Sequence, residues 1–118
     1  MISGAEPTIH GDGEQSHNFT FVPNVVEANL LACRASGAAW LVYKIGTGDR
    51  YTLNHTLQLI GKISGMPASA KHGLPRKADI RDSQADIAQA RQIIGYNPGV
   101  DFEEGLKQPW DWYYSSRI

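Results

Sequence analysis

Apolar residues recur at helical spacing in the first half of the chain. We expect a helix after Asn24, which can cap it, with Val26, Leu30 and Cys33 on its buried face. On that face, Cys33 is predicted to be a buried, unreactive thiol. A second helix is predicted over Leu53–Ser64, because its apolar residues share one stripe and a glycine follows it. Two amphipathic helices therefore organise the first half.

The second half has two further helical patterns with clear end signals. Asp86 can cap a helix that ends at Gly95, and apolar side chains repeat on one face between them. Asp101 can cap a fourth helix that continues to the aromatic residues around Tyr113. Pro109 lies inside this last segment and has no backbone donor, so we expect it to kink or split the helix.

Strand-like patterns are short and few. Asn18–Val22 alternates polar and apolar residues, which predicts a strand just before the first helix. Ala39–Ile45 is rich in Trp, Val and Tyr and predicts a buried strand that ends in the Gly46–Gly48 loop. The stretch 69–86 is polar and irregular, with a further short strand expected around Ile80. The pattern predicts a small, helix-rich α/β fold in a single domain over residues 1–118.

Composition narrows the function classes. A chain of 118 residues suits one domain and has no room for a dinucleotide-binding domain plus a substrate domain. A formal net charge of -1 gives no general attraction for nucleic acid or for an anionic membrane. One cysteine excludes an internal disulfide, and the longest apolar run, Ala38–Tyr43, is too short to span a bilayer. We expect a cytoplasmic protein without nucleic-acid or membrane partners.

Three groups of residues could carry chemistry. Gly46 and Gly48 suggest a phosphate loop, but Tyr51 stands where a dinucleotide fingerprint has its third glycine, which favours an ordinary loop. The wide spacing of the His and Asp residues at 10, 12 and 17 matches no tight metal site. The charged segment 76–82 has arginine forks that suit phosphate and carboxylates that suit ribose hydroxyls. Taken alone, the segment is better explained as a solvated run of surface charges.

Five motifs in fixed order give a more specific indication. They are Pro-Thr-Ile-His-Gly-Asp-Gly-Glu-Gln at 7–15, Asn-Val-Val-Glu-Ala-Asn-Leu-Leu-Ala at 24–32, Ile-Gly-Thr-Gly at 45–48, Asp-Ile-Arg-Asp-Ser-Gln-Ala-Asp at 79–86, and the segment from Gly95-Tyr-Asn-Pro to Phe-Glu-Glu-Gly105. With these motifs, the chain resembles the extended short-chain dehydrogenase/reductase family, in particular UDP-glucose 4-epimerase-like NAD-dependent epimerases and dehydratases. The resemblance covers residues 5 to 114 and implies the C-terminal, nucleotide-sugar-binding subdomain, without the Rossmann domain.

The resemblance implies a binding site for a UDP-sugar. It assigns Arg76 to the diphosphate and Asp79 to the ribose, although the glycine of the family's Arg-x-Gly-Asp pattern is Ala78 here. The segment Thr8, Ile9 and His10 would line the uridine. His17 and Asn18 replace the family's Arg-Asp pair, Pro23 stands where an acidic residue is common, and Pro109 where threonine is usual. The loss of the family's second phosphate-binding arginine implies weaker binding.

The resemblance also implies where the catalytic parts belong. The family's glycine-rich NAD loop and its Tyr-x-x-x-Lys pair lie upstream of the matching region, and no tyrosine in this chain is followed four positions later by lysine. We therefore expect no catalytic residue and no cofactor in this chain, with NAD held by the other half in full-length members. The expected partner is a separate Rossmann-domain chain or a second copy of this chain. The alternative is a non-catalytic binding or oligomerisation module on the same fold.

Overall fold

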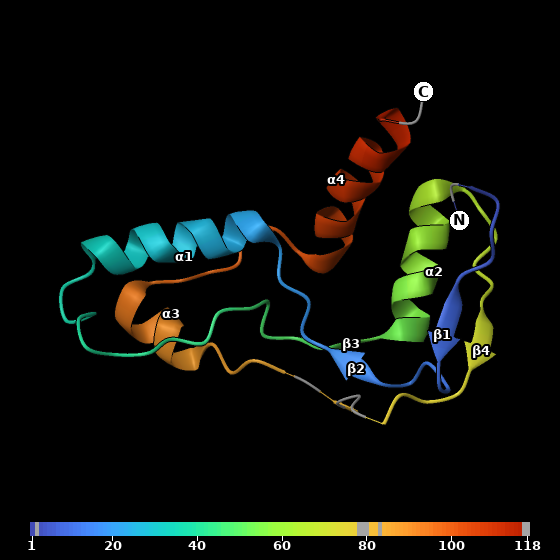
Figure 1. Ribbon diagram of the computed structural model, residues 1–118. Coiled ribbons are helices and arrows are strands. Elements are labelled where there is room, and N and C mark those ends of the chain that lie inside the picture. The colour runs from blue at the N-terminus through green and yellow to red at the C-terminus, as the bar shows by residue number, and fades with distance from the viewer. Residues whose placement is uncertain (2, 78–80, 83, 117–118) are drawn as a thin grey trace.

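The computed structural model describes residues 1, 3–77, 81–82 and 84–116 as a helix-rich α/β arrangement (Figure 1). Its elements, in chain order, are β1 (Thr8–His10), β2 (Ser16–His17), α1 (Val22–Arg34), β3 (Tyr51–Thr52), α2 (Leu53–Ser64), β4 (Lys71–Gly73), α3 (Ala88–Ile94) and α4 (Phe102–Ser115). The predicted fold class is confirmed. None of the helices in the described ranges has the length and apolar character that crossing a membrane requires.

Two small two-stranded sheets tie together distant parts of the chain. β1 pairs with β4 in parallel, with Ile9 opposite His72, and β2 pairs with β3 in antiparallel register. An isolated parallel bridge from Ser16 to Asp82 extends the second sheet. The segment that follows β4 is thereby held beside the turn between β1 and β2.

The helices are distributed between two ends of the molecule (Figure 1). At one end, α1 packs on α3, and the small core there centres on Ala28, Ala90, Ile94 and Tyr96. The hydroxyl of Tyr96 donates to the carbonyl of Gly46 at 2.7 Å, which satisfies a phenol that is only 1% exposed. At the other end, α2 contacts α4 and lies beside the β1–β4 sheet.

A stack of aromatic rings forms a second packing centre near the start of α4. The ring of Phe102 stacks on Tyr51 with centroids 4.1 Å apart and on Phe19 with centroids 4.9 Å apart. These three rings come from β3, from α4 and from the connection before α1. Their contact therefore joins the two ends of the fold by apolar and π interactions.

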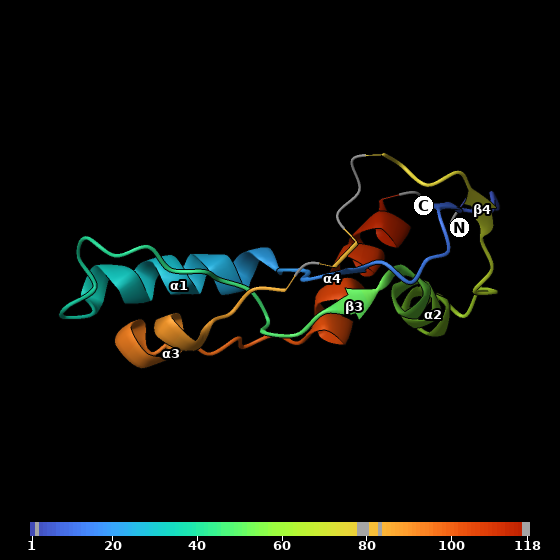
Figure 2. The same ribbon diagram turned by 90° about the horizontal axis from the view of Figure 1, so that it is seen from below.

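The molecule is flatter and more open than a compact domain of its length (Figure 2). Its radius of gyration is 16.8 Å, whereas a compact chain of 118 residues is expected to reach about 13.5 Å. Its accessible surface is 7968 Å², about a quarter more than the roughly 6,300 Å² typical of a 13.0 kDa monomer. Exposed apolar side chains include Val22, Val26 and Leu30 on α1 and Trp40 and Val42 beyond it.

Two helices have the ends that their sequences predict, and a third has the predicted C-terminal end. α2 spans the predicted Leu53–Ser64 and stops at Gly65, whose φ of 68° is left-handed. Gly95 ends α3 as predicted, but the N-cap of that helix is Ile87 and not Asp86, whose carboxylate lies one residue earlier and accepts from the amide of Ala88 at 3.0 Å. Asp101 caps α4 through the amide of Glu104 at 2.9 Å. These capping and terminating residues lie within one turn of the helix ends, so they can be recognised from the sequence alone.

The cap predicted for the first helix is wrong. α1 begins at Val22, so Asn24 lies inside the helix and not at its cap. It is 2% exposed, and its amide donates to the carbonyl of Val100 at 2.9 Å and accepts from the Val100 amide at 3.2 Å. Of the two outcomes predicted at Pro109, a kink or a split, the split does not occur, because α4 continues through Pro109 as one helix.

The predicted buried face of α1 is also wrong. Val26 and Leu30 are 52% and 50% exposed, and Cys33 is an exposed thiol. The residues that pack inward are Asn24 and Ala28. The periodicity identified an apolar stripe, but it could not show that α3 covers a different side of the helix.

Both strand predictions that can be checked are wrong. The strand near 18–22 is displaced, since β2 ends at His17 and the chain turns into α1 at Val22. Residues 39–45 form no strand, because no neighbouring strand pairs with them in the described part of the chain. The strand predicted around Ile80 falls outside the described residues, while β4 forms earlier in that same polar stretch.

Candidate functional site

A pocket of about 330 Å³ lies among β1, β2 and α2, within the volume range of small-molecule sites. We call it the β1–α2 pocket. Every predicted site residue that the structure describes lines it, namely Thr8, Ile9, His10, His17 and Arg76. Asp79 lies outside the described residues. The structure thus brings together side chains that are up to 68 positions apart in the printed sequence.

The strand β1 forms one wall of this pocket. Its pairing with β4 holds the strand extended, so successive side chains alternate in exposure: Thr8 is exposed, Ile9 is 8% exposed and His10 is half-buried. Across the pocket, α2 supplies the apolar side chains of Leu57 and Ile60. The pocket therefore combines an apolar floor with polar groups from β1.

The Gly11–Gly13 turn after β1 is fixed from several directions. The amide of Gly11 donates to the carbonyl of Gly73 at 3.0 Å, and Nδ1 of His72 lies 2.8 Å from the carbonyl of Gly11. Gly13 has a φ of 79° and lies against the side chain of Asn54, where a β-carbon would collide. This turn is thus held in one conformation beside the pocket.

An ion pair joins the same turn to the segment after β4. The guanidinium of Arg81 contacts both carboxylate oxygens of Asp12, at 2.9 and 3.2 Å. The hydrogen bond from Arg81 holds the pKa of Asp12 below its usual value, and the amide of Glu14 contributes in the same direction. Beside it, the hydroxyl of Ser16 donates to Asp82 at 2.6 Å and lowers the pKa of that carboxyl. Both contacts hold the segment that carries Arg76 against the β1–β2 turn.

Among the residues recorded in the pocket lining, Arg76 is the one lysine or arginine. Arg76 is exposed there, and no side chain in the described ranges is recorded in a hydrogen bond or salt bridge with it. His17 is half-buried, with its ring edge against Phe19 at a centroid distance of 6.0 Å. An exposed guanidinium above an apolar floor suits a ligand that has an anionic end and a flat, less polar end.

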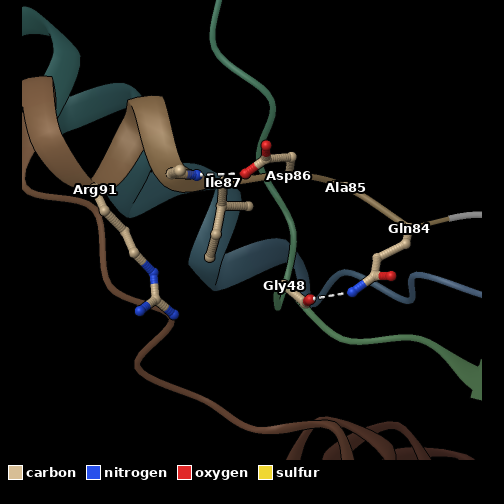
Figure 3. A pocket seen from close by; sticks show the side chains of 7 residues that line it. Gly48, Gln84, Ala85, Asp86, Ile87 and Arg91 are labelled. Carbon is tan, nitrogen blue, oxygen red and sulfur yellow. Dashed lines mark hydrogen bonds between the residues drawn. The ribbon is translucent and has the colours of Figure 1, made fainter.

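A larger pocket, of about 510 Å³, lies between the Gly48 loop and the start of α3 (Figure 3). None of the predicted site residues within the described ranges lines it. Its polar groups are used within the chain, since Gln84 donates to the Gly48 carbonyl at 2.7 Å and Asp86 accepts from the first amide of α3. Arg91 projects into it from α3 and is exposed. Volume alone therefore does not make this pocket the candidate site.

The glycine pair at 46 and 48 does not fit a cofactor loop. A β-carbon on Gly46 would collide with Asn18 and approach that of Ala85 at 3.2 Å, and one on Gly48 would lie 3.2 Å from Ile87. These glycines are required where the chain packs on itself, and no strand leads into them. Within the described residues, this loop cannot cradle the pyrophosphate of NAD in the manner of a dinucleotide fold.

The pocket also contains a buried polar residue for which the sequence predicts no role. Gln15 lines the β1–α2 pocket, is only 5% exposed, and donates from Nε2 to the carbonyl of His10 at 2.8 Å. It belongs to the 7–15 motif, but a glutamine in a turn region has no periodic or compositional signal that marks it as buried. Its position becomes visible only in three dimensions.

Comparison with known proteins identifies close structural relatives. The structure of UDP-glucose 4-epimerase from Thermotoga maritima with UDP-glucose superposes with a TM-score of 0.93 and 36% identity, over 100% of this chain and 38% of that one. UDP-N-acetylglucosamine 4-epimerase from Methanobrevibacter ruminantium, in complex with UDP-N-acetylmuramic acid, gives a TM-score of 0.87 and 31% identity over 98% and 36% of the two chains. UDP-glucose 4-epimerase of Mycolicibacterium smegmatis is 27% identical over 96% of this chain and 36% of that protein.

Each of these matches covers only part of the related protein. The chain spans about a third of the curated relatives it matches, with coverage of 35%, 32% and 36% in three of them. No protein-family profile matches the chain. The similarity therefore applies to one part of a larger architecture.

Proposed function

Because the chain belongs to the NAD-dependent epimerase/dehydratase family and corresponds to its C-terminal portion, we propose that it binds a nucleotide diphosphate-sugar in the β1–α2 pocket. The observation that carries this proposal is the convergence of β1, His17 and Arg76 on one pocket. Similar proteins were solved with UDP-glucose and UDP-N-acetylmuramic acid. A UDP-sugar is accordingly the ligand that we propose.

The side chains suggest how the ligand would be oriented. The guanidinium of Arg76 can donate two parallel hydrogen bonds to phosphate oxygens, a charge-assisted contact worth about 1.5 to 3 kcal/mol. Asp79 is proposed to accept from a ribose hydroxyl. The extended backbone of Thr8 to His10 would lie along the uridine, with Ile9 and the α2 side chains beneath it.

Catalysis would require a second component. Epimerisation at a sugar carbon needs a hydride acceptor and a base beside it, and this chain has no Tyr-x-x-x-Lys pair. When bound by the other half, NAD would supply the hydride chemistry. The residues of this chain would hold the diphosphate and the nucleoside while that half acts on the sugar. In this proposal the chain is one part of a split or longer epimerase.

A second candidate function is a non-catalytic binding or oligomerisation module. The observation that favours it is the exposed apolar surface of α1, with Val22, Val26 and Leu30 between 50% and 70% exposed. Exposed apolar patches of this kind mark interaction surfaces. The partner would be a Rossmann-domain chain or a second copy of this chain, and the two proposals differ in whether a nucleotide sugar binds.

Calorimetric titration with UDP-glucose tests the first proposal. We expect saturable binding that Arg76→Ala weakens at least tenfold, the loss expected for one charge-assisted contact. Arg91→Ala is the matched control, because Arg91 is also an exposed arginine but lines the other pocket. Equal affinities of wild type and Arg76→Ala would refute the assignment of this site. Absence of binding would leave the module without its proposed ligand.

A further inference from the structure

Residues 41–45 have the side-chain arrangement of an edge strand, although they form no sheet. Tyr43 and Ile45 are partly buried against the core between α1 and α3, whereas Val42 is 87% exposed and Lys44 is exposed. This alternation has the two-residue period of a strand that is covered on one face. Valine, tyrosine and isoleucine also favour strands. One face of the segment is thus already packed, and what it lacks is a neighbouring strand.

The backbone of this segment is open to pairing. No N–H or C=O group of residues 42–45 is recorded in a hydrogen bond with another residue that the structure describes. Figure 2 shows the chain after α1 turning back and running along that helix. Sheet edges are normally protected by proline, by charged side chains or by a covering element. Here Lys44 is the only charge between positions 38 and 46, and that stretch contains no proline.

The sequence of the segment is complementary to itself in one antiparallel register. A two-fold axis at Tyr43 places Leu41 opposite Ile45 of the second copy, and Val42 opposite Lys44. The pairs on the inner face are then apolar or aromatic, as stable cross-strand pairs are. On the outer face, the aliphatic stem of each lysine lies across the exposed valine of the other copy.

The neighbouring registers with the same alternation are less favourable. An axis at Lys44 would place two ammonium groups directly opposite each other, which destabilises a strand pair. An axis at Val42 would bring Trp40 into the ladder, but this residue has a φ of 67° and is not extended. The axis at Tyr43 avoids both problems.

We propose that two copies of this chain pair antiparallel through residues 41–45, with Tyr43 at the two-fold axis. The inference rests on the second proposed function, the oligomerisation module, and gives that module a specific interface. Both copies use the same edge, so the assembly closes as a dimer and cannot extend into a fibre. The formal net charge of -1 gives little repulsion between the copies.

Charge variants of the complete chain test this register by sedimentation. We expect a wild-type dimer, and Val42→Lys should raise its dissociation constant about fivefold or more, because each new lysine faces Lys44 of the other copy. The double variant Val42→Lys with Lys44→Glu should restore dimerisation, since opposite charges then face each other. Gln58→Lys is the control, because it adds the same charge at an exposed position of α2. A monomeric wild type, or equal dissociation constants for the single and double variants, would overturn the proposal.

Cysteine cross-linking tests the register independently of these charges. The exposed thiol of Cys33 is first removed by Cys33→Ser. In that background, a mixture of Val42→Cys and Lys44→Cys chains should form disulfides between the two different chains, because directly opposite β-carbons lie about 5 Å apart and diagonal ones about 7 to 8 Å. Each variant alone should cross-link more slowly. Faster cross-linking of Val42→Cys with itself would overturn the assigned register.

The outcomes also separate this inference from the proposed nucleotide-sugar site. A monomeric wild type that binds UDP-glucose through Arg76 would overturn the pairing and leave that site in place. A dimer that responds to the charge variants but binds no UDP-glucose would support the pairing and refute the site. If wild type is monomeric and forms a complex with a Rossmann half that Val42→Lys abolishes, the edge belongs to that partner, and pairing with a second copy is overturned.

Discussion

Arg81 and Asp12 form a two-point ion pair, with Nη1 to Oδ1 at 2.9 Å and Nη2 to Oδ2 at 3.2 Å. The pair spans 69 positions of sequence and connects the turn after β1 with the segment after β4. Those two segments carry the polar groups proposed to bind the ligand. The ion pair is largely exposed, with side-chain exposures of 61% and 56%, so its main effect is on local geometry and not on global stability.

Arg81→Gln should change how stability depends on pH. The pKa of Asp12 is lowered in the folded chain, chiefly by the hydrogen bond from Arg81. The contribution of the pair is therefore present above the unfolded pKa, which is about 3.9, and is lost as the pH falls through the lower folded value. Between about pH 5 and pH 2, wild type should lose more thermal stability than Arg81→Gln. Parallel melting curves across that range would contradict the prediction.

His17→Arg should strengthen nucleotide-sugar binding at neutral pH. Arginine offers a permanently charged, planar fork that can donate two parallel hydrogen bonds to phosphate oxygens, and an imidazole ring has no such fork. The arginine variant should therefore bind UDP-glucose more tightly than wild type in calorimetric titrations at pH 7.5. Equal affinities of the two proteins would mean that His17 makes no ligand contact.

Asn24→Ala should destabilise the fold through loss of a buried cross-link. Both hydrogen bonds of the Asn24 amide go to the backbone of Val100, which precedes α4. Removing them leaves a buried donor and acceptor unpaired, at a cost of about 1 to 3 kcal/mol. Urea unfolding followed by circular dichroism measures this. Asn29→Ala is the control, since that exposed side chain bonds only to Val25 in its own helix and should change stability by less than about 0.5 kcal/mol.

The exposed surface of α1 should make the chain self-associate when no partner is present. Val26 and Leu30 are about half exposed and line an apolar groove on that helix. Leu30→Glu should shift the sedimentation profile toward monomer, because a carboxylate cannot be buried there without cost. Gln58→Glu adds the same charge at an exposed position of α2 and should leave the profile unchanged. A monomeric wild type that binds no apolar dye would contradict the prediction.

The chain alone should not bind NADH. The Gly46–Gly48 loop packs against Asn18, Ala85 and Ile87, so it cannot approach a pyrophosphate as a dinucleotide-binding turn does. Titration of NADH followed by its fluorescence should show no saturation in the micromolar range. Adding a Rossmann half from a related epimerase should introduce saturable binding. Micromolar binding by the chain alone would refute the prediction.

The helix ends could be predicted because they depend on neighbouring residues. Asp101 caps α4, and Gly65 ends α2, through contacts within one turn of chain. The segment 39–45 could not be predicted correctly, because a strand exists only when another strand pairs with it. The buried side of α1 likewise depends on α3, which is distant in sequence. The periodicity of apolar residues identifies a stripe along a helix, but it does not identify the element that packs on the helix.

Part of the candidate site could likewise be predicted from the sequence, and part could not. The resemblance indicates Arg76 and the β1 segment, and the fold places both on one pocket. Gln15 could not be found from sequence, because its burial results from the turn after β1 folding back on that strand. A polar residue in a glycine-rich turn is ordinarily solvated.

The flat shape of the molecule has a consequence for amide hydrogen exchange. Its shortest dimension is 18 Å, about the thickness of two packed helices, so no element is covered on all sides. Exchange should therefore proceed by opening of single elements, and few amides should be protected to the level of global unfolding. The slowest amides should lie in α1 and α3, around the buried ring of Tyr96, while those of α4 beyond Pro109 exchange rapidly.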